Sequence, residues 1–269
     1  TMRWSDTTPR KFTYEVGFNM TYFNSLWKVK ADEALSDLMN PYKRQTHQTD
    51  YYGLGYIDTG LYQNKEDILN SPRRLGSTQT KLGDIGYTDV NGDGKIDGED
   101  QVRIGKPTMP HFTYAFDFSL GYEGFTLSGL LYGTGERYMT FGNRYQSGEG
   151  KYLYYENQLN YWRPDNTGAD FPRISISSGV NGNNNKAGST FWMRNASYLR
   201  LKDLQLSYDF KYKYLKKCDW LQTCRVNLSG SNLFTISGVS KFFDPETSST
   251  SGDGYPVQRV YSIGVTIGF

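Results

Sequence analysis

The sequence predicts an all-β protein: a segment of a transmembrane antiparallel β-barrel with long extracellular loops. Three observations support this fold class. Stretches of about ten residues alternate large apolar with small or polar side chains, the period of a strand with two different faces. Many of the apolar residues are rings, since aromatic residues make up 16% of the chain although its mean hydropathy is -0.66. The last stretch keeps the alternation to Phe269, as a strand that closes an outer-membrane barrel and faces lipid does.

Composition disfavours several other classes of protein. The net charge is +2, which gives no electrostatic reason to expect a nucleic-acid partner. No apolar run approaches the ~18 residues of a membrane helix. No leader peptide opens the chain, so we expect a mature chain or a fragment that lacks its beginning. Cys218 and Cys224 lie near a predicted turn, where a disulfide and two free thiols are both open.

The first expected strand is Phe12–Tyr22, where every even position is apolar. The segment 24–110 then loses the alternation and is rich in Asp, Asn, Gly and Tyr, which is typical of a long loop. Within it we expect two short helices, Ala31–Met39 with Asp32 as its cap, and Lys65–Leu69.

Alternation returns in Phe112–Leu120 and Phe125–Thr134. Between them, Gly121-Tyr122-Glu123-Gly124 favours a tight hairpin turn, because glycine adopts the positive φ that such a turn needs. The segment 135–196 breaks the pattern again and is expected to be a second long loop.

Three further strands are expected, Leu199–Phe210, Thr223–Ile236 and Gln258–Phe269. The polar segment 211–222 connects the first two of them. The Gly- and Ser-rich segment 237–257 is a third long loop before the final strand.

These connections predict how the strands are oriented in a membrane. In bacterial barrels the termini and the short turns lie on the periplasmic side, and the long loops lie outside. With Phe269 at the periplasmic end, all three long segments fall on the extracellular side. A soluble β-sandwich gives no reason for the long loops to share one end. Six strands enclose too small a lumen, so we expect the rest of the wall to come from residues outside this sequence.

The most specific motif is the segment 89–100, which matches a calcium loop of EF-hand type. Oxygen-bearing residues alternate along it, with Gly at its sixth position and an apolar residue at its eighth. Asp100 replaces the usual Glu, whose longer side chain binds with both oxygens, so a lower affinity is expected. Strand-like sequences flank the loop, so calcium is expected to pin an extracellular loop; the alternative is an acidic turn without metal. The expected ligands are Asp89, Asn91, Asp93, Lys95 through its carbonyl, Asp97 and Asp100.

An aromatic cluster in the second long loop is a candidate substrate site. Ring faces beside amides and charged groups suit a sugar or a peptide. Packing of the loop against itself or a partner is the more frequent role of such a cluster. No nucleophile motif or acid/base pair is recognisable, so no enzymatic activity is expected. The cluster consists of Tyr152, Tyr154, Tyr155, Tyr161, Trp162 and Arg163.

Short motifs also follow one another in a specific order from about Tyr51 to the end of the chain. They are Gly60-Leu61-Tyr62-Gln63, Gly83-Asp84-Ile85 before the calcium loop, Asn195 to Lys202, Ser231-Asn232-Leu233-Phe234-Thr235, Asp244-Pro245-Glu246 and the terminal Gly268-Phe269. In this order the chain resembles the C-terminal part of SusC/RagA-type TonB-dependent outer-membrane transporters of Bacteroidetes.

The resemblance implies a plugged barrel of roughly 22 strands. It further implies import of oligosaccharides or peptides across the outer membrane, driven by the TonB complex, and a SusD-like surface lipoprotein over the outer opening. The plug and the segment that contacts TonB are expected to lie outside this sequence. The alternative is a secreted, calcium-stabilised β-sandwich that binds glycans. That module should dissolve in water, whereas the barrel segment should need detergent or outer-membrane lipid.

Overall fold

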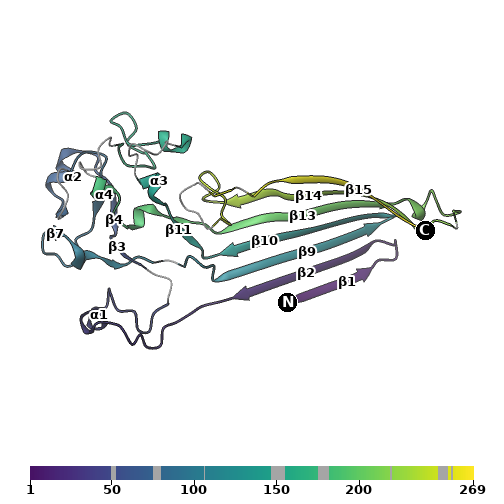
Figure 1. Cartoon of the computed structure of the whole chain (residues 1–269), viewed down its shortest axis with the longest axis horizontal. Helices are drawn as coiled ribbons and strands as arrows, with labels where there is room; N and C mark the ends of the chain where they lie inside the picture. The colour runs from purple at the N-terminus through teal and green to yellow at the C-terminus, as the bar shows by residue number, and fades with distance from the viewer. Residues whose placement is uncertain are drawn as a thin grey trace.

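The computed structural model describes residues 1–49, 53–74, 80–105, 107–146, 155–174, 182–218, 220–247, 254–255 and 257–269. Its main feature is a long antiparallel sheet of seven strands that extends from a cluster of loops at one end (Figure 1). The strands are β1 (Met2–Thr7), β2 (Thr13–Tyr22), β9 (Phe112–Tyr122), β10 (Phe125–Gly135), β13 (Tyr198–Asp209), β14 (Thr223–Ser237) and β15 (Val260–Gly268), and they lie in this order across the sheet.

All six predicted strands are present, and their ends differ from the predicted ends by at most two residues. The additional strand is β1, which pairs with β2 so that Trp4 lies beside Val16. The sequence does not predict it because the strand is short and only Met2 and Trp4 are apolar on alternate positions. Asp6 occupies the next position on the same face.

The turn between β9 and β10 is the predicted hairpin. Tyr122 pairs with Phe125, and the two residues between them, Glu123 and Gly124, have φ values of +46° and +85°. Two consecutive positive φ values are typical of the type I′ turn, whose twist matches that of the strands it joins. A tight turn therefore joins β9 and β10 at the end of the sheet opposite the long loops.

The three long connections, β2 to β9, β10 to β13 and β14 to β15, are found at one end of the sheet, as predicted (Figure 1). We call them together the loop assembly. They contain the short elements α1 (Leu35–Met39), β3 (Leu54–Gly55), β4 (Asp58–Leu61), α2 (Lys65–Leu69), β5 (Arg73–Arg74), β6 (Ile85–Tyr87), β7 (Lys95–Ile96), η1 (Gly98–Asp100), β8 (Val102–Arg103), β11 (Tyr138–Thr140), α3 (Asn143–Gln146), η2 (Glu156–Leu159), α4 (Gly182–Asn185), η3 (Thr190–Trp192) and β12 (Met193–Asn195).

The two predicted helices are both present, one of them shorter than expected. Helix α2 has the predicted bounds and begins with a capping box between Asn64 and Asp67. Helix α1 begins only at Leu35, and its N-cap is Ala34 without a side-chain hydrogen bond, so the prediction that Asp32 caps it is wrong.

The sheet is open in the described part of the chain, with β1 and β15 as its two edges, so closure of a barrel is not seen. Cys218 and Cys224, for which two states were open, are free thiols. Among the described residues, no helix is both long enough and apolar enough to cross a lipid bilayer.

Candidate functional site

One face of the seven-stranded sheet is apolar across all its strands. The register places Val16 beside Phe118 and Leu228 beside Ile263, and the alternation extends these rows along each strand. We call this surface the apolar face. Its members include Met2, Trp4, Val16, Phe18, Met20, Phe116, Phe118, Leu206, Leu228, Ile263, Val265 and Ile267.

The apolar face is not covered by another layer in the described chain. Ile263 and Val265 are 74% and 63% exposed. The other sheets of the described residues have two strands each and belong to the loop assembly (Figure 1). A β-sandwich would bury these side chains between two sheets, so the arrangement argues against that alternative.

The opposite face of the sheet is polar. Arg3 forms ion pairs of 3.4 Å with Glu15 on the neighbouring strand β2 and with Asp117 on β9, one strand farther. Gly17 lies between Arg3 and Asp117 in the register, and a Cβ atom there would come within 2.4 Å of the Asp117 carboxylate. Farther along, Ser231 donates a hydrogen bond of 2.7 Å to Asp203. The sheet thus separates an apolar surface from a surface suited to water.

The loop assembly has an aromatic core of its own, to which all three long connections contribute. The ring of Phe141 lies 4.9 Å from that of Phe242, and the Tyr145 hydroxyl donates a hydrogen bond of 2.9 Å to the Phe242 carbonyl. Trp192 at its centre is fully buried. The loops therefore pack as one unit. The core consists of Tyr56, Ile85, Tyr87, Ile96, Phe141, Tyr145, Phe171 and Trp192, with Phe242 and Phe243 against it.

A buried carboxylate, Asp84, joins the first connection to the second. Its oxygens lie 2.9 Å from the Asn185 amide nitrogen and 2.8 Å from Arg173 Nε, and they accept a hydrogen bond of 2.7 Å from the Lys81 backbone. Burial raises the pKa of Asp84, and the hydrogen bonds and Arg173 offset this only in part.

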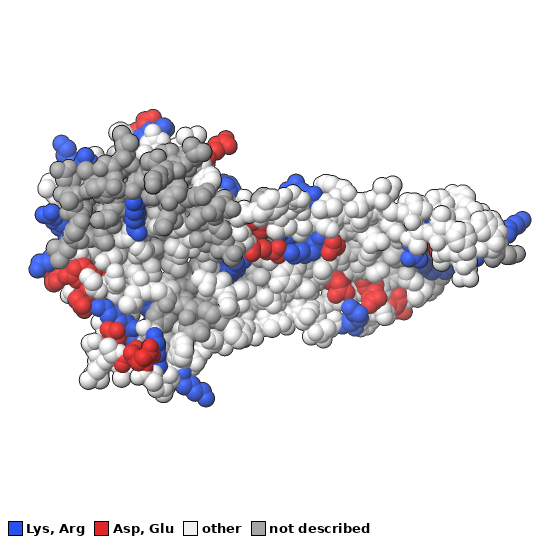
Figure 2. Space-filling view, viewed as in Figure 1, with Lys and Arg blue, Asp and Glu red and all other residues white. Residues whose placement is uncertain are grey.

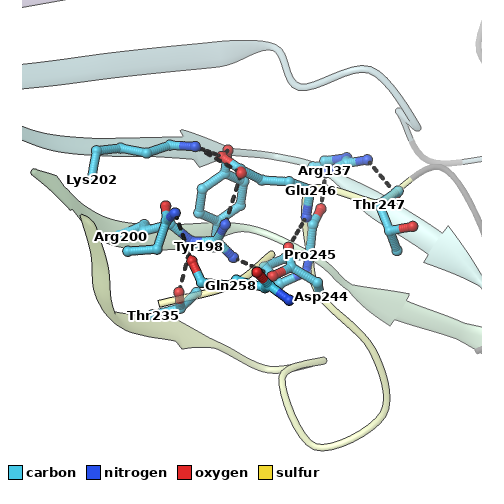
Figure 3. A network of polar contacts seen from close by, with 11 residues as sticks. Arg137, Tyr198, Arg200, Lys202, Thr235, Asp244, Pro245, Glu246, Thr247 and Gln258 are labelled. Atoms are coloured by element: carbon cyan, nitrogen blue, oxygen red, sulfur yellow. Dashed lines mark hydrogen bonds and ion pairs between the residues drawn. The ribbon is translucent and has the colours of Figure 1, made fainter. Parts of the chain in front are cut away.

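Five charged or hydroxyl side chains tie the third connection to strand β13; we call them the Arg200 latch (Figure 3). The Arg200 guanidinium donates hydrogen bonds of 2.7 Å to Asp244 and 2.8 Å to Glu246. The Tyr198 hydroxyl donates one of 2.5 Å to Glu246, and Lys202 Nζ lies 2.7 Å from the same carboxylate. Arg200 is fully buried, and a buried charge needs a partner of opposite charge. The carboxylates of Asp244 and Glu246 in the third connection supply it.

Arg137 holds the same segment from the second connection. Its guanidinium donates hydrogen bonds to the carbonyl oxygens of Pro245 and, at 3.4 Å, Thr247 (Figure 3). Burial raises the pKa of Glu246, but the hydrogen bonds from Lys202 and Tyr198 and the charge of Arg200 outweigh burial and lower it below its ordinary value. Glu246 is therefore a carboxylate at neutral pH.

The latch was not predicted as a site. The segment Asp244-Pro245-Glu246 contributes only to the family resemblance. The sequence feature that could indicate the site is Arg200, a charged residue between Leu199 and Leu201 in an alternating strand. Its partner Asp244 is 44 residues away, a separation that no local pattern reveals.

The segment of the predicted calcium loop turns sharply at its sixth residue. Gly94, the sixth residue, has a φ of +81°, as the sharp turn requires. Its first residue, Asp89, accepts hydrogen bonds of 2.6 Å and 2.8 Å from the backbone N–H groups of Gly92 and Gly94. Desolvation raises the pKa of Asp89, but these hydrogen bonds outweigh it and lower the pKa. Asn91 and Asp93 each accept a similar bond from the residue two positions later.

The last residues of the loop are fixed by the backbone. Asp100 is fully buried and accepts hydrogen bonds of 2.9 Å from Val90 and 2.8 Å from Asp97 backbone N–H groups, while Asp97 caps η1 through Glu99. In the described part of the chain, no three His, Cys, Asp or Glu side chains are grouped as a metal site. The donor set is all oxygen and suits a hard cation, with Lys95 contributing only a carbonyl. Calcium binding stays a prediction.

The aromatic cluster of the second connection is mostly part of the loop core. Tyr152 and Tyr154 lie outside the described residues. Tyr155 and Tyr161 pack against the core, and Trp162, 7% exposed, donates a hydrogen bond of 2.8 Å from its indole N–H to Gln63. Arg163 lies 5.1 Å from the Tyr161 ring centroid and 3.3 Å from Asp165, near the surface. This arrangement fits a packing role for the rings; substrate contact stays a prediction.

Two curated proteins are similar in sequence. TonB-dependent receptors P3 and P26 of Formosa agariphila are 27% and 26% identical to this chain over 228 residues. The matches cover 80% and 78% of this chain but 22% of each receptor. The chain therefore spans about a fifth of the length of these relatives. No protein-family model matches the chain.

Solved structures of the RagAB peptide transporter have the same fold. One of them superimposes with a TM-score of 0.69 at 20% identity, covering 99% of this chain and 28% of that chain. A RagAB peptide importer in the closed-closed state gives a TM-score of 0.67. At this identity the likeness concerns the fold, here the large sheet with its loops. TonB-dependent receptors are not enzymes, in agreement with the expected lack of enzymatic activity. Over most of its length, the chain is homologous to one part of TonB-dependent receptors.

Proposed function

We propose that this chain forms the C-terminal wall of an outer-membrane transporter that imports oligosaccharides or peptides with energy from the TonB complex. The observation that carries the proposal is the apolar face, which is exposed across seven strands in a protein related to TonB-dependent receptors. A surface of this size lined by Trp, Phe, Ile and Val is unfavourable in water and favourable in hydrocarbon.

In this arrangement the apolar face contacts outer-membrane lipid and the polar face lines the lumen. Antiparallel strands with apolar residues outside and polar residues inside are the pattern of outer-membrane barrels. The ion pairs of Arg3 then lie on the lumen side. The remaining strands and the plug of a barrel of roughly 22 strands would complete the wall.

The loop assembly then lies on the extracellular side, where substrate first meets the transporter. The common aromatic core and the Arg200 latch support this role, because they hold the three long connections in one arrangement above the lumen. A SusD-like surface lipoprotein over this assembly is the proposed partner. Relatedness to the RagAB fold favours peptides, while oligosaccharides remain in the proposed substrate class.

The membrane position is tested by charge placement on the two faces of β15 in the full-length receptor. Ile263→Lys puts a charge on the apolar face, and Ser262→Lys puts the same charge on the polar face one residue away. A lysine facing the middle of the bilayer costs about 2–4 kcal/mol in barrels. We expect Ile263→Lys to lower the amount of receptor in the outer membrane and Ser262→Lys to leave it unchanged.

Transport is tested in the same cells with labelled peptides and oligosaccharides. Uptake through the unmodified receptor should disappear when TonB is deleted and when the SusD-like lipoprotein is removed. A receptor that fractionates with water-soluble proteins, or that tolerates both lysines equally, would contradict the proposal.

A further inference from the structure

A pocket of about 660 Å³ is lined by residues of the β9–β10 turn and of the connection between β13 and β14. Both lie at the end of the sheet opposite the loop assembly (Figure 1). The floor of the pocket is the last row of the apolar face, where Phe125 pairs with Tyr208 and Tyr208 with Val226. Its wall is the connection between β13 and β14, which begins with η4 (Phe210–Tyr212). The pocket therefore opens where the apolar face ends.

Rings line this pocket. The ring centroids of Phe125 and Tyr208 are 4.4 Å apart, and Phe210 packs edge-on against Tyr208 at 5.0 Å. Gly124 brings the hairpin turn against the wall, since a Cβ atom on it would lie 3.0 Å from the Cβ of Tyr212. The pocket is thus formed by the end of the apolar face and by two turns that pack together.

Two lysines are among the residues that line the pocket. Lys213 Nζ lies 6.0 Å from the ring centroid of Tyr214, and Lys216 Nζ lies 5.5 Å from that of Tyr212. Both line the pocket, and basic side chains are seen at this tip of the molecule (Figure 2). Glu123 is the single acidic residue among the described residues of the lining, so the opening is positive.

We propose that this pocket binds an anionic glycerophospholipid at the periplasmic surface of the membrane. The proposal rests on the proposed function, because it needs the apolar face to lie in lipid. The acyl chains would lie along the apolar face over Phe125 and Val226. The phosphate would lie between Lys213, Lys216 and the Tyr212 hydroxyl, since aromatic residues and lysines are favoured at the headgroup level.

The charge balance favours an anionic lipid over a zwitterionic one. A choline headgroup brings a positive charge toward two lysines, whereas a glycerol headgroup leaves the phosphate charge unopposed. Each lysine near the membrane surface contributes attraction to anionic lipid that depends on ionic strength. Glu123 weakens this attraction, so its removal should strengthen binding of the anionic lipid.

The experiment uses the full-length receptor in detergent, titrated with dioleoyl phosphatidylglycerol or dioleoyl phosphatidylcholine and read by native mass spectrometry. The variant K213Q/K216Q should lose about 30-fold in affinity for phosphatidylglycerol and little for phosphatidylcholine. The matched control K28Q/K65Q removes two exposed lysines of the loop assembly and should bind both lipids as the unmodified receptor does. Glu123→Gln should raise the affinity for phosphatidylglycerol.

Two results would overturn the lipid site. One is equal affinity of K213Q/K216Q and the unmodified receptor for phosphatidylglycerol while both have the same melting temperature. Another is complete displacement of the lipid by millimolar inorganic phosphate, which would indicate a site for a free anion. These results leave the transporter proposal intact as long as the receptor fractionates with the outer membrane; a water-soluble receptor would contradict the transporter proposal itself.

Discussion

The guanidinium of Arg200 on strand β13 and the carboxylate of Asp244 in the last long connection form an ion pair of 2.7 Å. Arg200 is fully buried, and the Thr235 hydroxyl accepts a further hydrogen bond of 2.7 Å from its Nε. Every described hydrogen-bond partner of this guanidinium is thus an oxygen held by strand β14 or by the loop. The loop is tied to the wall of the sheet at this point.

Replacing Arg200 by methionine should release this loop. The substitution leaves the carboxylates of Asp244 and Glu246 without their main cation, and breaking a buried pair costs about 3–5 kcal/mol. We expect faster proteolysis within 238–259 in the full-length receptor, while the amount in the membrane stays the same. Lys28→Met, which alters an exposed residue of the first connection, serves as the control. Equal proteolysis of both variants would show that the latch does not hold the loop.

Acidification should weaken the same loop through Glu246. The pKa of Glu246 is lower in the folded protein than its ordinary value of 4.5, so the ionised form stabilises the fold. This contribution is complete above pH 4.5 and decreases as the pH falls through the lowered value. Protease resistance of the loop should therefore fall below about pH 4.5, and Glu246→Gln should already have the lower resistance at neutral pH. A pH profile that is identical in the variant and the unmodified receptor would contradict this assignment.

Calcium should protect the segment 89–100. Bound calcium would neutralise Asp89, Asp93 and Asp97, which lie close along one loop, and would hold the backbone around Gly94. Tryptic cleavage after Lys95 should be slower with calcium than with a chelator. Asp93→Asn should reduce this difference, and Asp165→Asn, outside the loop, should preserve it. Digestion patterns that do not change with the chelator would argue for an acidic turn without metal.

Gly83→Ala should destabilise the loop assembly. Gly83 has a φ of +79°, and a Cβ atom there would lie 2.4 Å from the ring of Trp162. The strained backbone and the displaced ring together should cost about 1–3 kcal/mol. Gly168→Ala is a matched control, since it lies in the same assembly with no atom within 4 Å of the added Cβ. Thermal unfolding followed by tryptophan fluorescence measures both; equal melting temperatures would show that Trp162 adapts at no cost.

Strands that alternate cleanly were predictable, because their two faces meet different surroundings. Phe112 to Tyr122 and Val260 to Gly268 have period-two patterns over nine or more residues, and both are strands. Strand β1 was not predictable in this way, because only Met2 and Trp4 are apolar on alternate positions before Asp6 ends the pattern. Its position comes from pairing with β2, which is a tertiary contact.

The candidate site was predictable only where its residues are close in sequence. The sharp turn at Gly94 follows from a local motif. Asp244 and Asn185, which pair with Arg200 and Asp84, come from distant connections, and the Trp162 ring lies against Gly83 of another connection. Composition and spacing carry no information about such contacts, because they form only when the three connections pack together.

The open edges of the sheet have a consequence for biogenesis. Strands β1 and β15 each have one side on which the described chain supplies no neighbouring strand. In the proposed membrane setting, every unpaired peptide group at such an edge would cost several kcal/mol, because hydrocarbon offers no hydrogen-bond partner. The edges of β1 and β15 should therefore pair with further strands during membrane insertion itself. A polypeptide limited to these residues should aggregate through pairing of these edges.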